Sequence, residues 1–162
     1  MADHHLTTTS RKAILWALAA GCCGLLLNRF LPIELYYRLS LLLGSLLPLV
    51  ILGLLGGRFG ILAGVVAASG TLLIWLQPIP FLVLSLEIVL VALLVRRGMR
   101  LTQAVMLYWL VVGMPLLLLA YLFLLDISTQ AALVFALKFG LNGAFNAQIA
   151  ALIIVAIRYC LF

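Results

Sequence analysis

Charged side chains are scarce in this sequence, and their scarcity excludes most soluble folds. Only 9% of the 162 residues are Asp, Glu, Lys or Arg, whereas 67% are hydrophobic. Soluble domains carry about 25% charged residues, because those residues cover the surface that water contacts. A chain so poor in charge needs lipid as its solvent, and the sequence therefore predicts an integral membrane protein.

Residues that build metal centres and catalytic sites are also few. The three cysteines, Cys22, Cys23 and Cys160, show neither metal-ligand nor disulfide spacing, and the two histidines, His4 and His5, precede the first apolar run. The sequence contains no Ser/His/Asp set, no paired carboxylates and no Gly-rich phosphate loop. We therefore expect no cofactor, no metal site and no enzymatic activity within this chain.

Acidic residues are fewer than basic ones, which gives a formal net charge of +6. In a soluble protein this balance would suggest nucleic acid as a partner. Here the basic residues stand at the ends of apolar runs, where they meet lipid headgroups and set the orientation of the chain. We therefore expect no nucleic-acid partner.

Long apolar runs dominate what is present. Segments 41–55 and 81–95 are apolar on every face and lack the alternation of a membrane β-barrel, so we expect helices. A span needs about 20 residues, and 162 residues therefore allow about six. The expected fold is an all-α integral membrane bundle of six helices over residues 13–162, preceded by a cytoplasmic tail over 1–12. The expected spans are 13–31, 39–55, 59–76, 79–95, 102–125 and 128 to the C-terminus. We expect a kink at Pro48, and Pro115 falls inside the fifth span.

The distribution of Lys and Arg predicts the orientation. With the N-terminus in the cytoplasm, the outer side holds only Arg29 and Arg38, partly offset by Glu34. The cytoplasmic side then holds the other basic residues at span ends, namely Arg11, Lys12, Arg58, Arg96, Arg97, Arg100 and Arg158. Both termini are therefore expected in the cytoplasm.

Two ionisable residues fall inside predicted spans, where each costs at least about 2.5 kcal/mol and suggests a function. Glu87 lies in the middle of the fourth span, and Lys138 lies about ten residues into the sixth. At matched depth the two charges are expected to pair. Asn142 and Asn146 follow Lys138 on the same helical face, beside several phenylalanines. This polar stripe in an apolar lining favours a small-molecule site, with a purely structural pair or a proton or ion path as alternatives.

The third span carries Gly60, Gly64 and Ala68 at four-residue spacing. Small residues at this spacing let two helices approach closely. We interpret this face as internal packing within the bundle, with a homodimer interface as the alternative.

Several segments together resemble a bacterial membrane sensor domain. They are Leu55-Gly-Gly-Arg-Phe-Gly60, Leu86-Glu87, Tyr108-Trp109, Gly113-Met-Pro115 and Lys138-Phe-Gly-Leu-Asn142-Gly-Ala-Phe-Asn146. The family, the vitamin-uptake-like sensors, precedes diguanylate cyclases and sensor histidine kinases, and its six-helix fold is similar to the S components of energy-coupling-factor transporters. The resemblance covers roughly residues 11 to 158.

The resemblance implies a ligand-sensing module in a bacterial inner membrane that signals through its last helix to a cytoplasmic cyclase or kinase, with dimerisation possible. That output domain would lie outside this chain, which ends at Phe162. Ligand-binding roles would fall on Glu87, Tyr108, Trp109, Lys138, Asn142 and Asn146. Independently of the resemblance, one carboxylate, one amine and several aromatic rings would suit an amphipathic or zwitterionic small molecule. The alternatives are the substrate-binding S component of an uptake transporter, docking through the third span, and a structural assembly subunit without a ligand.

Overall fold

The computed structural model describes the backbone of residues 2–30, 33–34 and 40–161, and the side chains of residues 10–30, 42–73 and 76–160. The elements are α1 (Ala2–Phe30), β1 (Ile33–Glu34), β2 (Ser40–Leu41), α2 (Leu46–Leu55), α3 (Gly57–Trp75), α4 (Pro78–Arg96), α5 (Leu101–Tyr108), the π-helix η2 (Trp109–Gly113), α6 (Met114–Phe123) and α7 (Thr129–Leu161). The two strands form one short antiparallel pair in which Ile33 lies opposite Leu41. The expectation of an all-helical bundle is confirmed.

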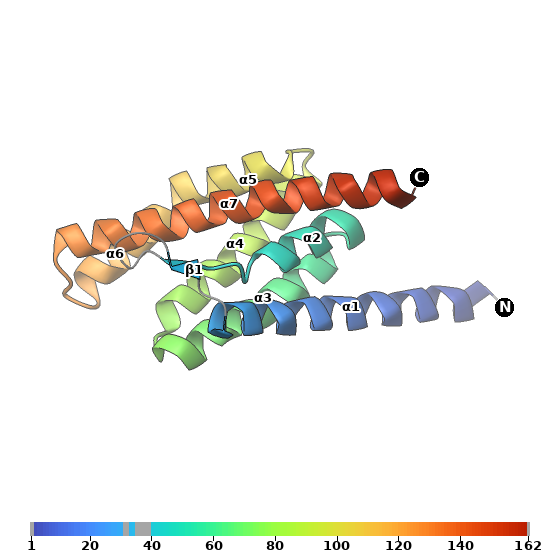
Figure 1. The fold of residues 1–162 in the computed structure, drawn as a ribbon, viewed down its shortest axis with the longest axis horizontal. Helices are drawn as coiled ribbons and strands as arrows, with labels where there is room; N and C mark the ends of the chain where they lie inside the picture. The colour runs from blue at the N-terminus through green and yellow to red at the C-terminus, as the bar shows by residue number, and fades with distance from the viewer. Residues whose placement is uncertain (1, 31–32, 35–39, 162) are drawn as a thin grey trace.

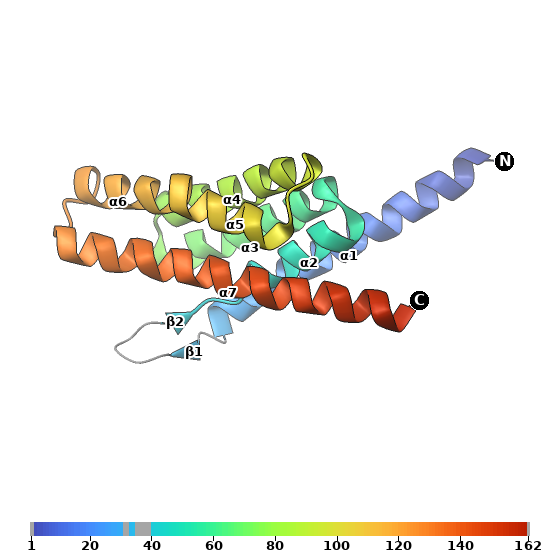
Figure 2. The same cartoon turned by 90° about the horizontal axis from the view of Figure 1, so that it is seen from above.

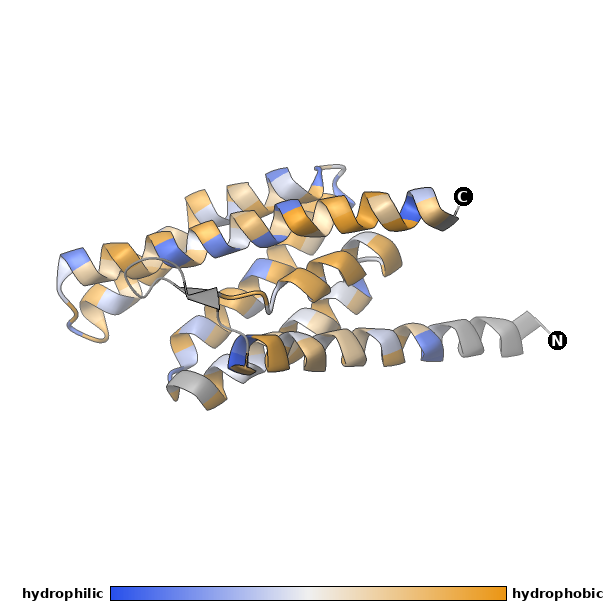
Figure 3. Cartoon of the chain, in the orientation of Figure 1, coloured by the Kyte–Doolittle hydropathy of each residue, from blue (hydrophilic) through white to orange (hydrophobic). Residues whose placement is uncertain are grey.

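Four helical segments in the described part of the chain are long and apolar enough to cross a membrane: Ser10–Phe30, Pro78–Arg96, Leu101–Phe123 and Thr129–Cys160. Two apolar helices, Leu46–Leu55 and Gly57–Leu73, are shorter than a full span. Large apolar side chains point outward from the bundle, including Trp16 at 67% exposure and Phe123 at 79%. Figure 3 shows the same pattern, with hydrophobic colours along most helix surfaces. Lipid is the solvent that such a surface suits.

The helices form one elongated bundle (Figures 1 and 2). The first helix packs along α3, α3 packs against α4, and α7 contacts α2 and the α5–η2–α6 segment. Both termini lie at the same end of the bundle, together with the α2–α3 and α4–α5 turns. Gly56 and Gly98 occupy these two turns with positive φ values of 97° and 94°, which only glycine adopts without strain.

The N-terminal segment is helical, because α1 begins at Ala2. The tail expected over residues 1–12 is therefore continuous with the first helix. The side chains of His4, His5 and Arg38, which entered the sequence arguments, lie outside the described residues.

The second apolar run departs most from expectation. The second span was expected from residue 39, which lies outside the described residues. Residues 40–45 were expected to be helical, but the helix starts only at Leu46, after β2 and a turn. Pro48 therefore lies in the first turn of α2, where its missing N–H has no helical partner to lose. The predicted kink at Pro48 is wrong for this reason. Hydropathy cannot detect the difference, because Leu41, Leu42 and Leu43 are as apolar as a helical span requires.

The small-residue face of α3 lies inside the bundle. Gly60, Gly64 and Ala68 are buried. A Cβ on Gly60 would collide with Leu52 of α2, and one on Gly64 with Ile88 of α4. Their lack of a side chain lets α3 approach both neighbours, so the structure supports internal packing.

Candidate functional site

A buried carboxylate marks the centre of the bundle. Glu87 stands midway along α4 and is only 2% exposed. Its Oε1 accepts a 2.7 Å hydrogen bond from the indole Nε1 of Trp109. A hydrogen bond to a charged group is worth about 1.5–3 kcal/mol, so this contact offsets a large part of the cost of burying the carboxyl group.

The π-helix η2 sets the position of Trp109. Pro115 has no backbone N–H, so the regular α-helical ladder cannot continue through it, and the N–H of Met114 reaches the carbonyl of Trp109 instead. Wider turns of this kind are frequently found at functional sites. Here the turn aims both Tyr108 and Trp109 into the bundle, where they are 1% and 2% exposed.

Neighbouring groups fix the indole in place. The hydroxyl of Tyr108 donates a 2.6 Å hydrogen bond to the carbonyl of Val83, which ties α5 to α4. The Trp109 ring stacks on Phe139 of α7, with centroids 6.3 Å apart and an interplanar angle of 24°. Gly143 faces the indole edge, and a Cβ there would collide with the Trp109 nitrogen. The absence of a side chain at Gly143 therefore makes room for the Glu87–Trp109 bond.

Two buried amides hold the non-helical segment before α2. Asn146 of α7 is 1% exposed, and its Nδ2 donates to the carbonyl of Leu42 (2.8 Å) and to Oγ of Ser45 (2.7 Å). Oδ1 of Asn28, near the end of α1, accepts a 2.8 Å hydrogen bond from the N–H of Gly44. Non-helical backbone at membrane depth is tolerated only where protein groups satisfy it. These side chains do so here, and they bring the segment against Glu87.

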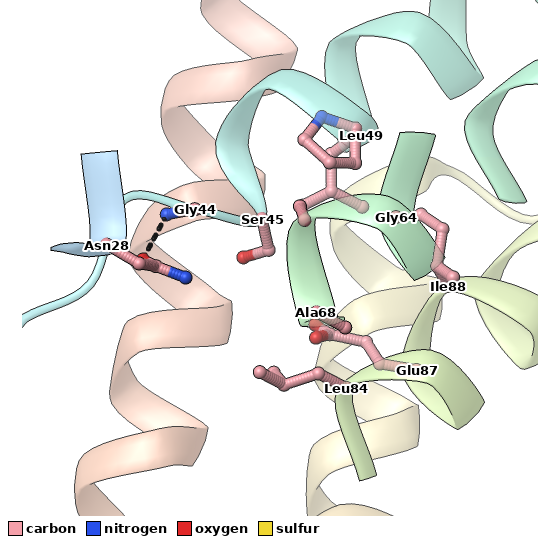
Figure 4. A pocket seen from close by; sticks show the side chains of 11 residues that line it. Asn28, Gly44, Ser45, Leu49, Gly64, Ala68, Leu84, Glu87 and Ile88 are labelled. Atoms are coloured by element: carbon pink, nitrogen blue, oxygen red, sulfur yellow. Dashed lines mark hydrogen bonds between the residues drawn. The ribbon is translucent and has the colours of Figure 1, made fainter. Parts of the chain in front are cut away.

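Two small cavities, each of about 20 Å³, lie between these groups. Both are lined by Asn28, Ser45, Leu84 and Glu87. Figure 4 shows the first, where Ser45 and the Glu87 carboxyl group approach from opposite sides and Asn28 bonds to Gly44. The second extends toward Trp109, Phe139, Asn142 and Asn146. Each space accommodates about one water-sized particle.

Lys138 lines a different and larger cavity of about 240 Å³. Its neighbours there are Gln77, Tyr121, Ile127, Phe135 and Phe139. Tyr121 and Phe135 meet edge to face, with centroids 5.3 Å apart. Gln77 and Ile127 come from the loops at the end of the bundle opposite the termini. Phe139 lines this outer cavity and also the inner one beside Glu87.

The structure thus brings together four of the six residues singled out from the sequence. Glu87, Trp109, Asn142 and Asn146 line one inner cavity, and Tyr108 supports it from behind through Val83. Lys138 belongs to the outer cavity, and the hydrogen-bond donor beside Glu87 is Trp109. Glu87 and Lys138 thus line two different cavities, and Phe139 lines both.

Sequence reasoning missed Asn28, Ser45 and Gly143. Asn28 could have been noticed, because it is an amide inside the first apolar run. Its position near the end of that run, however, is also typical of a residue at the membrane interface. Ser45 gave no signal, because it fell inside an expected span. Gly143 gave none either, because its role depends on an indole from another helix.

The fold and the site define an all-helical membrane protein with a buried polar centre. Within the described residues, no three or more His, Cys, Asp or Glu side chains come together as a potential metal site. Comparisons with protein-family models, curated proteins and solved structures gave no match to this chain.

Proposed function

We propose that this protein is a ligand-sensing transmembrane module. A small molecule binds inside the bundle, and the last helix passes the signal to a cytoplasmic output domain such as a diguanylate cyclase or a histidine kinase. One observation carries the proposal: α7 lines both the outer and inner cavities and then continues to the end of the bundle where both termini lie. A ligand that moves α7 at the cavities therefore moves its far end too.

The outer cavity suits the ligand. At about 240 Å³ it lies at the small end of the range for small-molecule sites, roughly 300–1,000 Å³. It combines the ammonium group of Lys138 with aromatic surface from Tyr121 and Phe135 and the polar groups of Gln77 and Tyr121. This chemistry fits an amphipathic or zwitterionic molecule. Binding would act on α7 through Phe139, whose ring also stacks on Trp109.

The proposed location is a bacterial inner membrane, with both termini in the cytoplasm. Its support is that both termini lie at the same end of the bundle as the α2–α3 and α4–α5 turns. Arg58 lies in the first turn of α3, and Arg97 directly follows α4. Positive side chains concentrate on the cytoplasmic side of membrane proteins. The outer cavity would then open on the opposite side, where an extracellular ligand arrives.

We further propose that the bundle crosses the membrane six times, in the manner of S components. At 1.5 Å per residue, the ten residues of α2 cover only about 15 Å. The non-helical segment 40–45, held by Asn28 and Asn146, would complete that crossing. The fold would thus contain one broken span.

Native mass spectrometry of the detergent-purified protein tests the sensing function. We expect a discrete added mass on the parent protein that is lost in Lys138→Met and retained in Lys12→Met, which removes an exposed lysine from α1. We expect Glu87→Gln to weaken the adduct. Glu87 holds the indole of Trp109, and Trp109 stacks on Phe139, which lines the outer cavity. An adduct equally present in all four proteins, or absent from the parent at saturating cell extract, contradicts the proposal.

The uptake alternative makes a different prediction. The docking face that it would use on α3 is buried against α2 and α4, so it is not available to a transport partner. Coding sequence that continues past Phe162 into a cyclase or kinase would support the sensor. A stop codon beside genes for transport ATPases would support uptake.

A further inference from the structure

Residues that carry side-chain oxygens line the inner cavities from four separate elements. Glu87 of α4, Ser45 of the turn before α2 and Asn28 of α1 line both cavities, and Asn146 of α7 lines the second. Figure 4 shows Ser45, Asn28 and Glu87 around the first cavity. The set is unusual for a membrane interior, because every member carries an acceptor and the only net charge is negative.

One of these oxygens has no hydrogen-bond donor. Oδ1 of Asn146 is buried and unpartnered among the described residues, although the side chain is only 1% exposed. The amide cannot be reversed to correct this, because Nδ2 donates to the carbonyl of Leu42, which can only accept. An orphaned buried acceptor costs about 1–3 kcal/mol, so its retention in a residue that lines the same cavity as Glu87 suggests an occupant that binds oxygen.

The donor set selects the kind of occupant. Carboxylate, amide and hydroxyl oxygens are hard ligands that suit alkali and alkaline-earth cations. One carboxylate neutralises one positive charge, so a divalent ion would leave a net charge in the apolar interior. Each cavity of about 20 Å³ accommodates a single bare ion and excludes an organic ammonium group. A monovalent metal ion satisfies all three conditions.

We propose that the inner cavities bind one dehydrated sodium ion, coordinated by the oxygens of Glu87, Asn146 and Ser45, with Asn28 beside them. Broken helices that present oxygen ligands at membrane depth are a known way to hold such an ion. Here the break is the segment between β2 and α2. The ion would join α1, α4 and α7 to that segment and so stabilise one arrangement of the bundle. This inference goes beyond the proposed sensing function and does not depend on it.

Trp109 provides the readout, because its indole N–H bonds directly to Glu87. The test uses the full chain with Trp16 and Trp75 replaced by Phe, purified in detergent without sodium. NaCl, KCl, methylammonium chloride and choline chloride are titrated at constant ionic strength and constant pH, and Trp109 emission and the thermal midpoint are recorded. We expect a saturable change in emission and a rise in the midpoint with NaCl, a weaker response to KCl, and none to the two organic cations.

Variants place the ion at the site. Glu87→Gln keeps an oxygen for the Trp109 bond but removes the charge, and we expect it to abolish the sodium response. Ser45→Ala removes one neutral ligand, and we expect about a ten-fold loss of sodium affinity, which keeps the proposal testable if Glu87→Gln does not fold. Gln148→Ala, which removes an exposed amide from α7, is the matched control.

Three outcomes overturn the proposal. Equal responses to all four salts would show an effect of ionic strength alone. A response to methylammonium as strong as that to sodium would assign the site to an organic cation. Emission that changes with pH but never with sodium would show that the cavities hold water and that Glu87 exchanges only protons. The sensing function is tested separately from the ion site. If Lys138→Met loses the native-mass adduct but keeps the sodium response, the small molecule and the sodium ion bind at different sites.

Discussion

The indole nitrogen of Trp109 lies 2.7 Å from a carboxylate oxygen of Glu87, and this bond joins α4 to the π-helix η2 at the centre of the bundle. This hydrogen bond depends on the backbone at two other positions. Pro115 imposes the wider turn that aims the indole inward, and Gly143 on α7 leaves the space that its nitrogen occupies. Three helices therefore meet at one polar contact.

Removing the indole N–H of Trp109 tests how much this hydrogen bond contributes to the stability of the bundle. We expect Trp109→Phe to lower the free energy of unfolding in detergent by about 2–3 kcal/mol or more, because the carboxyl group loses its donor and the ring loses volume. Trp16→Phe, at an outward position that is 67% exposed, should change it little. A double-mutant cycle with Glu87→Leu should show a coupling of about 1.5–3 kcal/mol, and additive effects would disprove the link.

Gly143→Ala tests whether the close approach of α7 is required. The new methyl group would collide with the Trp109 nitrogen, so the indole or the helix must shift. We expect destabilisation of about 1–3 kcal/mol and a change in Trp109 emission. Gly140→Ala is the matched control on the same helix, because its methyl group meets only the flexible end of Met114. If the two variants behave alike, the space at Gly143 has no special role.

The amides of Asn28 and Asn146 should control the exposure of the segment before α2. In Asn28→Ala the N–H of Gly44 loses its acceptor, and in Asn146→Ala the carbonyl of Leu42 loses its donor. We expect each change to cost about 1–3 kcal/mol and to speed hydrogen exchange across residues 42–45. Gln148→Ala should leave exchange there unchanged. Unaltered exchange in both amide variants would mean that packing alone holds the segment.

Labelling can test the placement of the termini. Cys160 lies in the last turn of α7, near the C-terminus, and Gln130 lies in its first turn, at the opposite end of the bundle. With Cys22 and Cys23 replaced by Ala, we expect an impermeant maleimide added to intact cells to label a Gln130→Cys, Cys160→Ala variant. A protein retaining only Cys160 should react after lysis alone. The reverse pattern would place the outer cavity on the cytoplasmic side.

Part of the site could be predicted from the sequence, because burying an ionisable side chain in an apolar run costs free energy. An ionisable residue in an apolar run is expensive, so Glu87 was conspicuous without any structure. Asn142 and Asn146 shared a face with Lys138 by helical spacing alone, and the first two do line one cavity with Glu87. The partner of Glu87 was not accessible in this way, because it depends on how far α4 and η2 are rotated about their axes.

The sequence by itself determined that the chain is helical, apolar and suited to lipid, since these properties follow from composition and from the length of uninterrupted runs. It also determined that basic residues gather at particular helix ends. Only the tertiary structure decided that residues 40–45 leave the helix, because that break is stabilised by amides from Asn28 and Asn146, distant in the chain. Only the tertiary structure placed Glu87 and Lys138 in the linings of separate cavities, because that placement depends on how α4 and α7 are rotated about their axes.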